Sequence, residues 1–273
     1  MTDTPFKICV AGVSGRLGRS IAHEVIRRLD TVLTGALVSA DSVHRGADAG
    51  EIAGTGFLGL EAVVSLETAC EGADMVIDAS LPDFTAAMAG RLAARGGPGL
   101  VTGVTGLSSE QQKAVETAAR MIPVLQASNF SLGVAVMERL LADAARLLPA
   151  SEFDLEIVET HHRRKTDAPS GTALMLGRAA ARARGEALED RAVYARPRTG
   201  GARKSGEIGF SAVRGGGVTG EHEARFLAAF EEITLTHRAF DRYIFARGAV
   251  EAALWLKDRP AGLYSMQDLL GAA

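Results

Sequence analysis

Phe6-Lys-Ile-Cys-Val-Ala-Gly-Val-Ser-Gly-Arg-Leu-Gly18 decides the fold of the first half of the chain. Phe6–Ala11 is a short apolar run typical of a buried strand, and Gly12, Gly15 and Gly18 follow it before a helical pattern. Glycines at such a turn permit a tight bend and a close approach of backbone to phosphate, which the helix N-terminus attracts. The stretch therefore predicts a dinucleotide-binding turn. The alternative is an ordinary glycine-rich connection, since the spacing is not Gly-x-Gly-x-x-Gly.

Strands and helices alternate after this turn as far as residue 130. Further strands are expected over 32–38, 74–79, 99–102 and 123–126, and helices over 19–29, 84–95 and 108–120. Such alternation predicts α/β architecture with a parallel, doubly wound sheet of the Rossmann type. We therefore assign 1–130 to a dinucleotide-binding domain, together with a final segment, 241–273, whose helix is expected to pack back on it.

The pattern changes at about residue 131, which indicates a second domain over 131–240. Helices are expected over 132–148 and 170–184, and strands over 153–159, 208–213, 224–230 and 232–237. Strands that follow one another across glycine-rich or charged turns predict an α+β domain with an open mixed sheet.

Composition excludes several classes of protein. The chain has 273 residues, a hydrophobic fraction of 47% and a net charge of −3, which argues against broad nucleic-acid binding. No apolar run approaches the ~18 residues of a membrane span, and no signal peptide is evident, so we expect a cytoplasmic protein with no membrane partner. Cys9 and Cys70 fit no metal motif, and we expect both to be structural.

Two further loops follow expected strand ends. Gly103-Val-Thr-Gly106 comes after the strand over 99–102, and Ala127-Ser-Asn-Phe130 comes after the strand over 123–126. Ligands of open parallel sheets bind beyond the carboxyl ends of the strands. The two loops are therefore expected to contact the nicotinamide half of a dinucleotide, although plain strand–helix connections would have the same spacing.

The acid that often follows the second strand of such domains is missing. An Asp or Glu there binds the ribose hydroxyls of NAD and repels a 2′-phosphate, but this chain has Val38-Ser39, with Asp41 slightly later. We therefore predict that NADPH is used at least as well as NADH. His44 and Arg45 are expected to lie in an exposed loop rather than to bind phosphate.

Glu159-Thr-His-His-Arg-Arg-Lys-Thr-Asp-Ala-Pro-Ser-Gly-Thr172 is the richest chemical segment of the chain. Histidine is the usual group for proton transfer near neutral pH. Pro169 and Ser170 suit the start of a helix, where the N–H groups of Gly171 and Thr172 can bind an anion such as a carboxylate. A basic surface turn is the alternative. Adjacent His161 and His162 seldom converge on a metal, so no metal site is expected.

The segment Glu159-x-His-His-x-x-Lys-x-Asp-x-Pro-Ser-Gly-Thr-Ala173 closely resembles the signature of the 4-hydroxy-tetrahydrodipicolinate reductase family. Val10–Gly18, Gly103–Gly106 and Ala127–Ser131 resemble the cofactor segments of that family. Matches in the later half are Gly206–Phe210, Val213-Arg214, Gly220–His222, Gly248–Val250 and Ala253–Trp255. The histidine signature is highly specific, whereas the glycine loop is not.

The resemblance implies a homotetramer that uses NADPH and/or NADH to reduce (2S,4S)-4-hydroxy-2,3,4,5-tetrahydrodipicolinate to tetrahydrodipicolinate, with loss of water, in lysine and diaminopimelate biosynthesis. By position, His161 and Lys165 would be the proton-transfer residues, and the second domain would bind the dicarboxylate and build the tetramer. The substrate would be held by His162, Ser170, Gly171 and Thr172. The cofactor would be bound by Gly12, Val13, Ser14, Gly15, Arg16, Leu17, Ser39, Gly103, Val104, Thr105, Ala127, Ser128, Asn129 and Phe130.

Two other functions share part of this pattern. Another two-domain Rossmann oxidoreductase, such as an amino-acid or sugar dehydrogenase, would have the glycine loop but no reason to carry the full histidine signature. A dinucleotide-sensing or scaffold protein would need the glycine loop but not both His161 and Lys165.

Overall fold

A computed structural model describes residues 4–271 and divides the chain into two compact units. The first comprises Met1–Ser131 and Tyr243–Ala273, and the second comprises Leu132–Arg242. Within the described residues, no helix is long and apolar enough to cross a membrane.

The first unit is built on a six-stranded parallel sheet with the order β11-β5-β4-β3-β1-β2. Its strands are β1 (Phe6–Ala11), β2 (Thr31–Leu37), β3 (Met75–Asp78), β4 (Gly99–Thr102), β5 (Pro123–Gln126) and β11 (Gly262–Tyr264). Its helices are α1 (Arg16–Arg27), α2 (Ala49–Ala53), α3 (Leu66–Ala69), α4 (Pro82–Ala94), α5 (Ser109–Ala118), α8 (Tyr243–Leu256) and α9 (Met266–Leu269). The predicted parallel, doubly wound sheet is confirmed.

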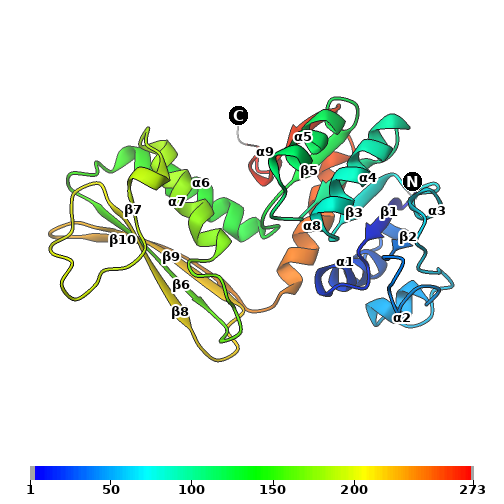
Figure 1. Cartoon of the computed structure of the whole chain (residues 1–273), viewed down its shortest axis with the longest axis horizontal. Coiled ribbons are helices and arrows are strands. Elements are labelled where there is room, and N and C mark those ends of the chain that lie inside the picture. The colour runs from blue at the N-terminus through cyan, green and yellow to red at the C-terminus, as the bar shows by residue number, and fades with distance from the viewer. Residues whose placement is uncertain (1–3, 272–273) are drawn as a thin grey trace. The chain divides into compact units, whose positions relative to one another are not determined.

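Helices cover both faces of this sheet (Figure 1). Helices α3, α4 and α5 pack on one face around a buried cluster that includes Met88, Leu92 and Val115. Helices α1 and α8 contact each other and the sheet from the opposite face. Two buried faces explain why the strands are mostly apolar rather than alternating between apolar and polar residues.

The glycines of the first turn have steric reasons. Gly12 has a φ of +75°, and a Cβ atom there would lie 2.6 Å from the carbonyl oxygen of Ala79. A Cβ atom at Gly18 would lie 2.1 Å from the carbonyl oxygen of Gly12. The glycine turn and the first turn of α1 therefore pack against each other. Helix α1 begins at Arg16, three residues before the predicted start at residue 19.

The second unit contains a five-stranded sheet with the order β10-β9-β6-β8-β7. Its elements are α6 (Leu132–Leu147), β6 (Asp154–His161), α7 (Gly171–Ala183), a 3-10 turn (Leu188–Asp190), β7 (Ala192–Val193), β8 (Ile208–Arg214), β9 (Gly220–Leu227) and β10 (Glu232–Ala239). Strand β6 runs parallel to β8 and antiparallel to β9, so the predicted open mixed sheet is confirmed.

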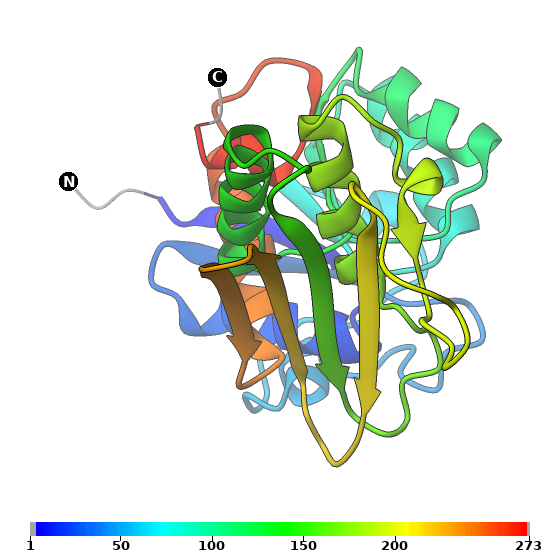
Figure 2. The same ribbon diagram turned by 90° about the vertical axis from the view of Figure 1, so that its left-hand side faces the viewer.

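Helices α6 and α7 lie along one face of this sheet (Figure 2). The core between them includes Leu141, Leu176, Ile157, Phe210 and Phe226. Three predicted strands have bounds that are wrong by two residues or more. Strand β6 extends to residue 161 instead of 159, β9 covers 220–227 instead of 224–230, and β10 extends to residue 239 instead of 237. His161 and His222 therefore lie on strands and not in loops.

Candidate functional site

The first unit has a candidate site of its own, a cavity of about 290 Å³ at the carboxyl ends of β1, β2 and β3. Gly12, Ser14, Gly15 and Ser39 were predicted to bind cofactor, and all four line it. The remaining lining residues are Leu37, Val38, Ala79, Ser80, Leu81 and Phe84. Sequence reasoning missed Ser80, Leu81 and Phe84, although the end of the strand over 74–79 was a signal that could have found them.

The other predicted cofactor residues lie outside this cavity lining. Val13 is fully buried, and Arg16 and Leu17 form the first turn of α1. Residues 103–105 follow β4 and residues 127–130 follow the adjacent β5, so the two loops lie at neighbouring strand ends. The backbone N–H of Ala127 donates to the carbonyl of Thr102 at 3.0 Å. Phe130 is 2% exposed, which indicates that its side chain supports the loop from inside.

A buried carboxylate organises the strand ends beside the cavity. Asp78, at the end of β3, is 0% exposed. Its Oδ2 accepts from the hydroxyls of Thr85 and Thr102 at 2.7 and 2.9 Å, and its Oδ1 accepts from the backbone N–H of Ser80 at 3.0 Å. Asp78 therefore ties the start of α4 to the end of β4 and fixes the Ser80 backbone on the cavity wall.

Both signs of charge are found near the second strand end. The guanidinium of Arg19 donates to the carbonyl of Ser14 at 3.0 Å and lies 2.8 Å from Nε2 of His44. Ser39 donates its hydroxyl to Asp41, which lowers the pKa of that carboxyl. His44 is half-buried instead of exposed, whereas Arg45 is exposed as expected.

The second unit has a separate candidate site around a buried carboxylate on β6. Glu159 is 1% exposed. Its Oε1 accepts from Nη2 of Arg214 at 2.6 Å and from the backbone N–H of Ser170 at 3.0 Å. Its Oε2 accepts from Nη1 of Arg214 at 2.7 Å and from Nδ1 of His161 at 2.5 Å.

Burial raises the pKa of Glu159, but the hydrogen bonds from Arg214 and His161 outweigh burial and hold the pKa below its usual value. Glu159 is therefore a carboxylate at neutral pH and can only accept hydrogen bonds. It fixes the proton of His161 on Nδ1 and leaves Nε2 as the second polar atom of the ring. Nε2 has room because residue 220 is glycine, where a Cβ atom would lie 3.1 Å from it.

A second histidine supports the first. The ring of His222 on β9 meets the ring of His161 edge-on, with centroids 5.2 Å apart, and its Nε2 lies 3.1 Å from the hydroxyl of Ser170. Burial, with a smaller contribution from the charge of His161, lowers the pKa of His222 to about 4. His222 is therefore neutral at physiological pH. Neither His222 nor Glu159 had been assigned a role from the sequence.

The predicted proton-transfer lysine follows in the loop after β6. Nζ of Lys165 lies 2.9 Å from Oδ1 of Asp167, and the lysine side chain is 22% exposed. His162 accepts from Nη2 of Arg242 at 3.1 Å, and desolvation together with the charge of Arg242 lowers its pKa. The segment thus presents cationic donors beside a neutral acceptor histidine.

The predicted helix start is confirmed, one residue after the expected position. Helix α7 begins at Gly171, and Ser170 is its N-cap, accepting from the backbone N–H of Ala173 at 3.2 Å. Space beside Gly171 is open, because no atom beyond its chain neighbours and the backbone of its own helical turn lies within 4 Å of where its Cβ would be. Ser170 also bonds to Glu159 and His222, so the helix start is fixed to the two strands that carry the histidines.

Over residues 4–271, no group of three or more His, Cys, Asp or Glu is arranged to hold a metal ion.

Family models match nearly the whole chain. The model described as "Dihydrodipicolinate reductase, N-terminus" matches residues 6–130, and the one described as "Dihydrodipicolinate reductase, C-terminus" matches residues 133–270. A relative from Caulobacter vibrioides, named 4-hydroxy-tetrahydrodipicolinate reductase, is 47% identical over 267 residues, 98% of each chain. A relative of the same name from Pseudomonas fluorescens is 45% identical and covers 97% of this chain and 98% of its own length.

Solved structures show the same fold. A dipicolinate-bound dihydrodipicolinate reductase from Paenisporosarcina sp. TG-14 superposes with a TM-score of 0.76 at 22% identity, over 97% of this chain and 99% of that one. A myo-inositol dehydrogenase from Corynebacterium glutamicum superposes with a TM-score of 0.58 at 15% identity, over 93% and 89% of the two chains.

Proposed function

This chain belongs to the dihydrodipicolinate reductase family, and from that premise we propose that it reduces (2S,4S)-4-hydroxy-2,3,4,5-tetrahydrodipicolinate to tetrahydrodipicolinate in lysine and diaminopimelate biosynthesis. The reaction consumes one NAD(P)H and one proton and releases one water. The protein therefore has three tasks: to bind the coenzyme, to hold a dicarboxylate, and to move protons.

The residues present fit a dinucleotide. Gly12 lets the backbone pass close to the third strand. The N-cap of α1 is Gly15, which has no capping side chain and so leaves the first N–H groups of the helix for a phosphate. The coenzyme, when bound, supplies the hydride for an electron-poor ring carbon of the substrate. Gly12, Ser14, Gly15 and Ser39 would hold its adenosine and pyrophosphate half, and residues 103–105 and 127–130 would hold the nicotinamide half.

The dicarboxylate is held at the start of α7. The N–H groups of Gly171 and Thr172 belong to the first turn of a 13-residue helix, whose partial positive charge attracts a carboxylate. The space beside Gly171 gives a carboxylate room to approach. His162 and Ser170 complete the proposed binding set. Such anchoring fixes the ring in one orientation, and orientation is a large part of enzymatic rate.

The protons are supplied by His161 and Lys165. His161 exchanges a proton through Nε2, because its Nδ1 proton is fixed by Glu159. Lys165, held by Asp167, acts as the second donor. The observation that carries this proposal is the His161–Glu159–Arg214 chain of contacts, since a buried carboxylate that orients a histidine is a general arrangement for acid–base catalysis.

A coupled assay tests the proposal: dihydrodipicolinate synthase generates the substrate in place, and oxidation of NADPH or NADH is followed by absorbance. Lys165→Ala and His161→Ala are each expected to lower kcat by about 100-fold or more, with little change in the Kd for coenzyme. Lys113→Ala, which removes an exposed lysine from α5 in the first unit, is the matched control and should retain full activity. Unchanged kcat in the Lys165 variant would remove that residue from the mechanism.

We also propose a homotetramer formed through the face of the second sheet that α6 and α7 leave open. Val213 on that face is 49% exposed and pairs with Thr160 of β6 in register. Light scattering should then give four times the chain mass of 28.5 kDa, and Val213→Asp should give smaller species.

Since a biosynthetic reductase needs the cellular NAD(P)H pool, we propose a cytoplasmic location.

A further inference from the structure

The two cysteines, 61 positions apart in the sequence, meet in the first unit. Cys9 lies in β1 and is fully buried, whereas Cys70 follows α3 and is partly exposed. Their Sγ atoms are 3.9 Å apart. A thiol pair at this distance can join without a change of fold, because a small movement of the Cys70 segment brings the sulfurs into bonding range.

A glycine makes this contact possible. Gly35 of β2 is the register partner of Cys9 in the sheet. A Cβ atom at Gly35 would lie 1.7 Å from the carbonyl oxygen of Ala69 and 3.0 Å from Sγ of Cys9. The end of α3 therefore lies directly on the sheet at this point, and Cys70 reaches the thiol beneath it.

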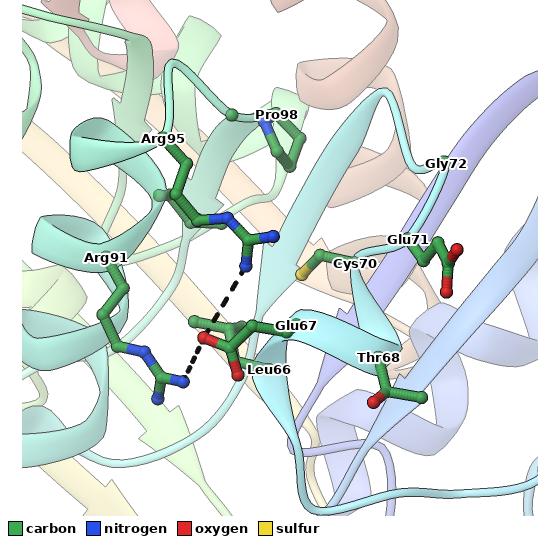
Figure 3. A pocket seen from close by; sticks show the side chains of 11 residues that line it. Leu66, Glu67, Thr68, Cys70, Glu71, Gly72, Arg91, Arg95 and Pro98 are labelled. Atoms are coloured by element: carbon green, nitrogen blue, oxygen red, sulfur yellow. Dashed lines mark hydrogen bonds and ion pairs between the residues drawn. The ribbon is translucent and has the colours of Figure 1, made fainter.

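Cys70 is accessible from a cavity of about 500 Å³ that is separate from the coenzyme cavity (Figure 3). Arg91 and Arg95 project into this cavity from α4 and its end, and both pair with Glu67. Figure 3 shows the Cys70 sulfur pointing toward the guanidinium of Arg95. A small neutral oxidant entering the cavity would meet Cys70 first, since Cys9 has no exposed surface.

The electrostatics distinguish the two thiols. The hydrogen bond with Cys9 lowers the pKa of Cys70 against the opposing effect of burial; the charges of Arg95 and Arg91 lower it further, and the charge of Glu67 opposes them. The bond with Cys70 and complete burial raise the pKa of Cys9. Cys70 is therefore the better nucleophile, and Cys9 is a protonated thiol held beside it, which is the usual division between an attacking and a resolving cysteine.

We propose that Cys70 is a site of oxidation by hydroperoxides and that Cys9 resolves the product to an internal disulfide. The Cys70 thiolate attacks the outer oxygen of ROOH, the O–O bond breaks, and the alkoxide leaves and takes a proton to become ROH. The sulfenic acid on Cys70 is then attacked by the sulfur of Cys9; the S–S bond forms, the S–O bond breaks, and the oxygen leaves as water with the Cys9 proton. Two thiols are oxidised and one hydroperoxide is reduced, and a dithiol reverses the change.

The test exposes the folded, full-length chain to tert-butyl hydroperoxide with dimedone present, followed by denaturation, alkylation and peptide mass spectrometry. The wild-type chain should lose both thiols, yield a Cys9–Cys70 linked peptide and carry no dimedone. In Cys9→Ser, Cys70 should carry dimedone, because its sulfenic acid has no resolving partner. In Cys70→Ser, Cys9 should stay reduced. Dithiothreitol should restore both thiols in the wild-type chain.

Three outcomes would overturn the proposal: both thiols intact after a dose that oxidises glutathione fully, oxidation of Cys9 in Cys70→Ser at the wild-type rate, or dimedone on Cys70 of the wild-type chain without a linked peptide. Circular dichroism of each variant before treatment checks that it is folded. Arg95→Ala, which leaves both thiols in place, should slow the loss of thiols without changing the products.

Discussion

Replacing Glu159 by Gln tests the buried carboxylate with the smallest change of shape. Each carboxylate oxygen accepts from two donors, so whichever way a Gln amide is turned, its NH₂ group faces two donors. Breaking a buried ion pair costs about 3–5 kcal/mol. Because the side chain of its partner Arg214 is 19% exposed and water can partly solvate it, we expect the lower end, about 3 kcal/mol off the free energy of unfolding.

The variant should also lose activity, since the carboxylate no longer fixes the proton of His161 on Nδ1. We expect kcat to fall by about 100-fold or more. Urea unfolding followed by circular dichroism measures the first effect, and the coupled assay measures the second. Nitrogen-15 NMR of the histidine ring gives the tautomer without substrate, so it remains informative whatever the reaction is.

Asp143→Asn is the matched control. Asp143 lies on α6 of the same unit, its side chain is 48% exposed, and it pairs with Arg146 at 2.8 Å. As a surface ion pair it should cost about 1 kcal/mol or less and leave kcat unchanged. If Glu159→Gln unfolded at the same urea concentration as Asp143→Asn and kept its kcat, the role assigned to the buried carboxylate would be wrong.

Three further perturbations follow from the same structure. His222 takes up its proton near pH 6.5 in the unfolded chain but only near pH 4 in the folded chain. The free energy of unfolding should therefore decrease by on the order of 3 kcal/mol as the pH falls through this window. Denaturant titrations of His222→Asn should show no such decrease. Gly12→Ala should lower the free energy of unfolding by about 1–3 kcal/mol, because its φ of +75° strains any other residue; equal stability would contradict this. In steady-state kinetics, kcat/KM with NADPH should equal or exceed kcat/KM with NADH, and a preference for NADH above about tenfold would refute this prediction. Arg19→Ala removes a cation near the second strand end, so it should lower kcat/KM with NADPH by about tenfold and kcat/KM with NADH by less.

Elements with a strong periodic pattern could be predicted from the sequence. Phe6–Ala11 and the strand ending at Asp78 are continuous apolar runs because both faces of their sheet are covered. Strand β11 (Gly262–Tyr264) was not predicted, since three residues, of which the central one is exposed, have no recognisable period and pair only because β5 offers an edge. The start of β9 was missed because Gly220 suggests a turn, whereas it is needed to leave space beside His161.

The site was predictable in its residues but not in its connections. The spacing of His161, Lys165 and Ser170 is visible along the chain. The role of Glu159 was not, because an acidic residue on an alternating strand looks solvent-exposed until Arg214, 55 positions later, pairs with it. The same holds for the two cysteines, whose contact depends on α3, a four-residue helix without a clear sequence pattern.

The most direct test of the proposed function is the coupled assay on the wild-type chain, with dihydrodipicolinate synthase as the source of substrate. We expect one NADPH to be oxidised for each substrate molecule that the synthase makes, and tetrahydrodipicolinate to accumulate. Absence of turnover with both NADPH and NADH, from a chain shown to be folded, would contradict the assignment.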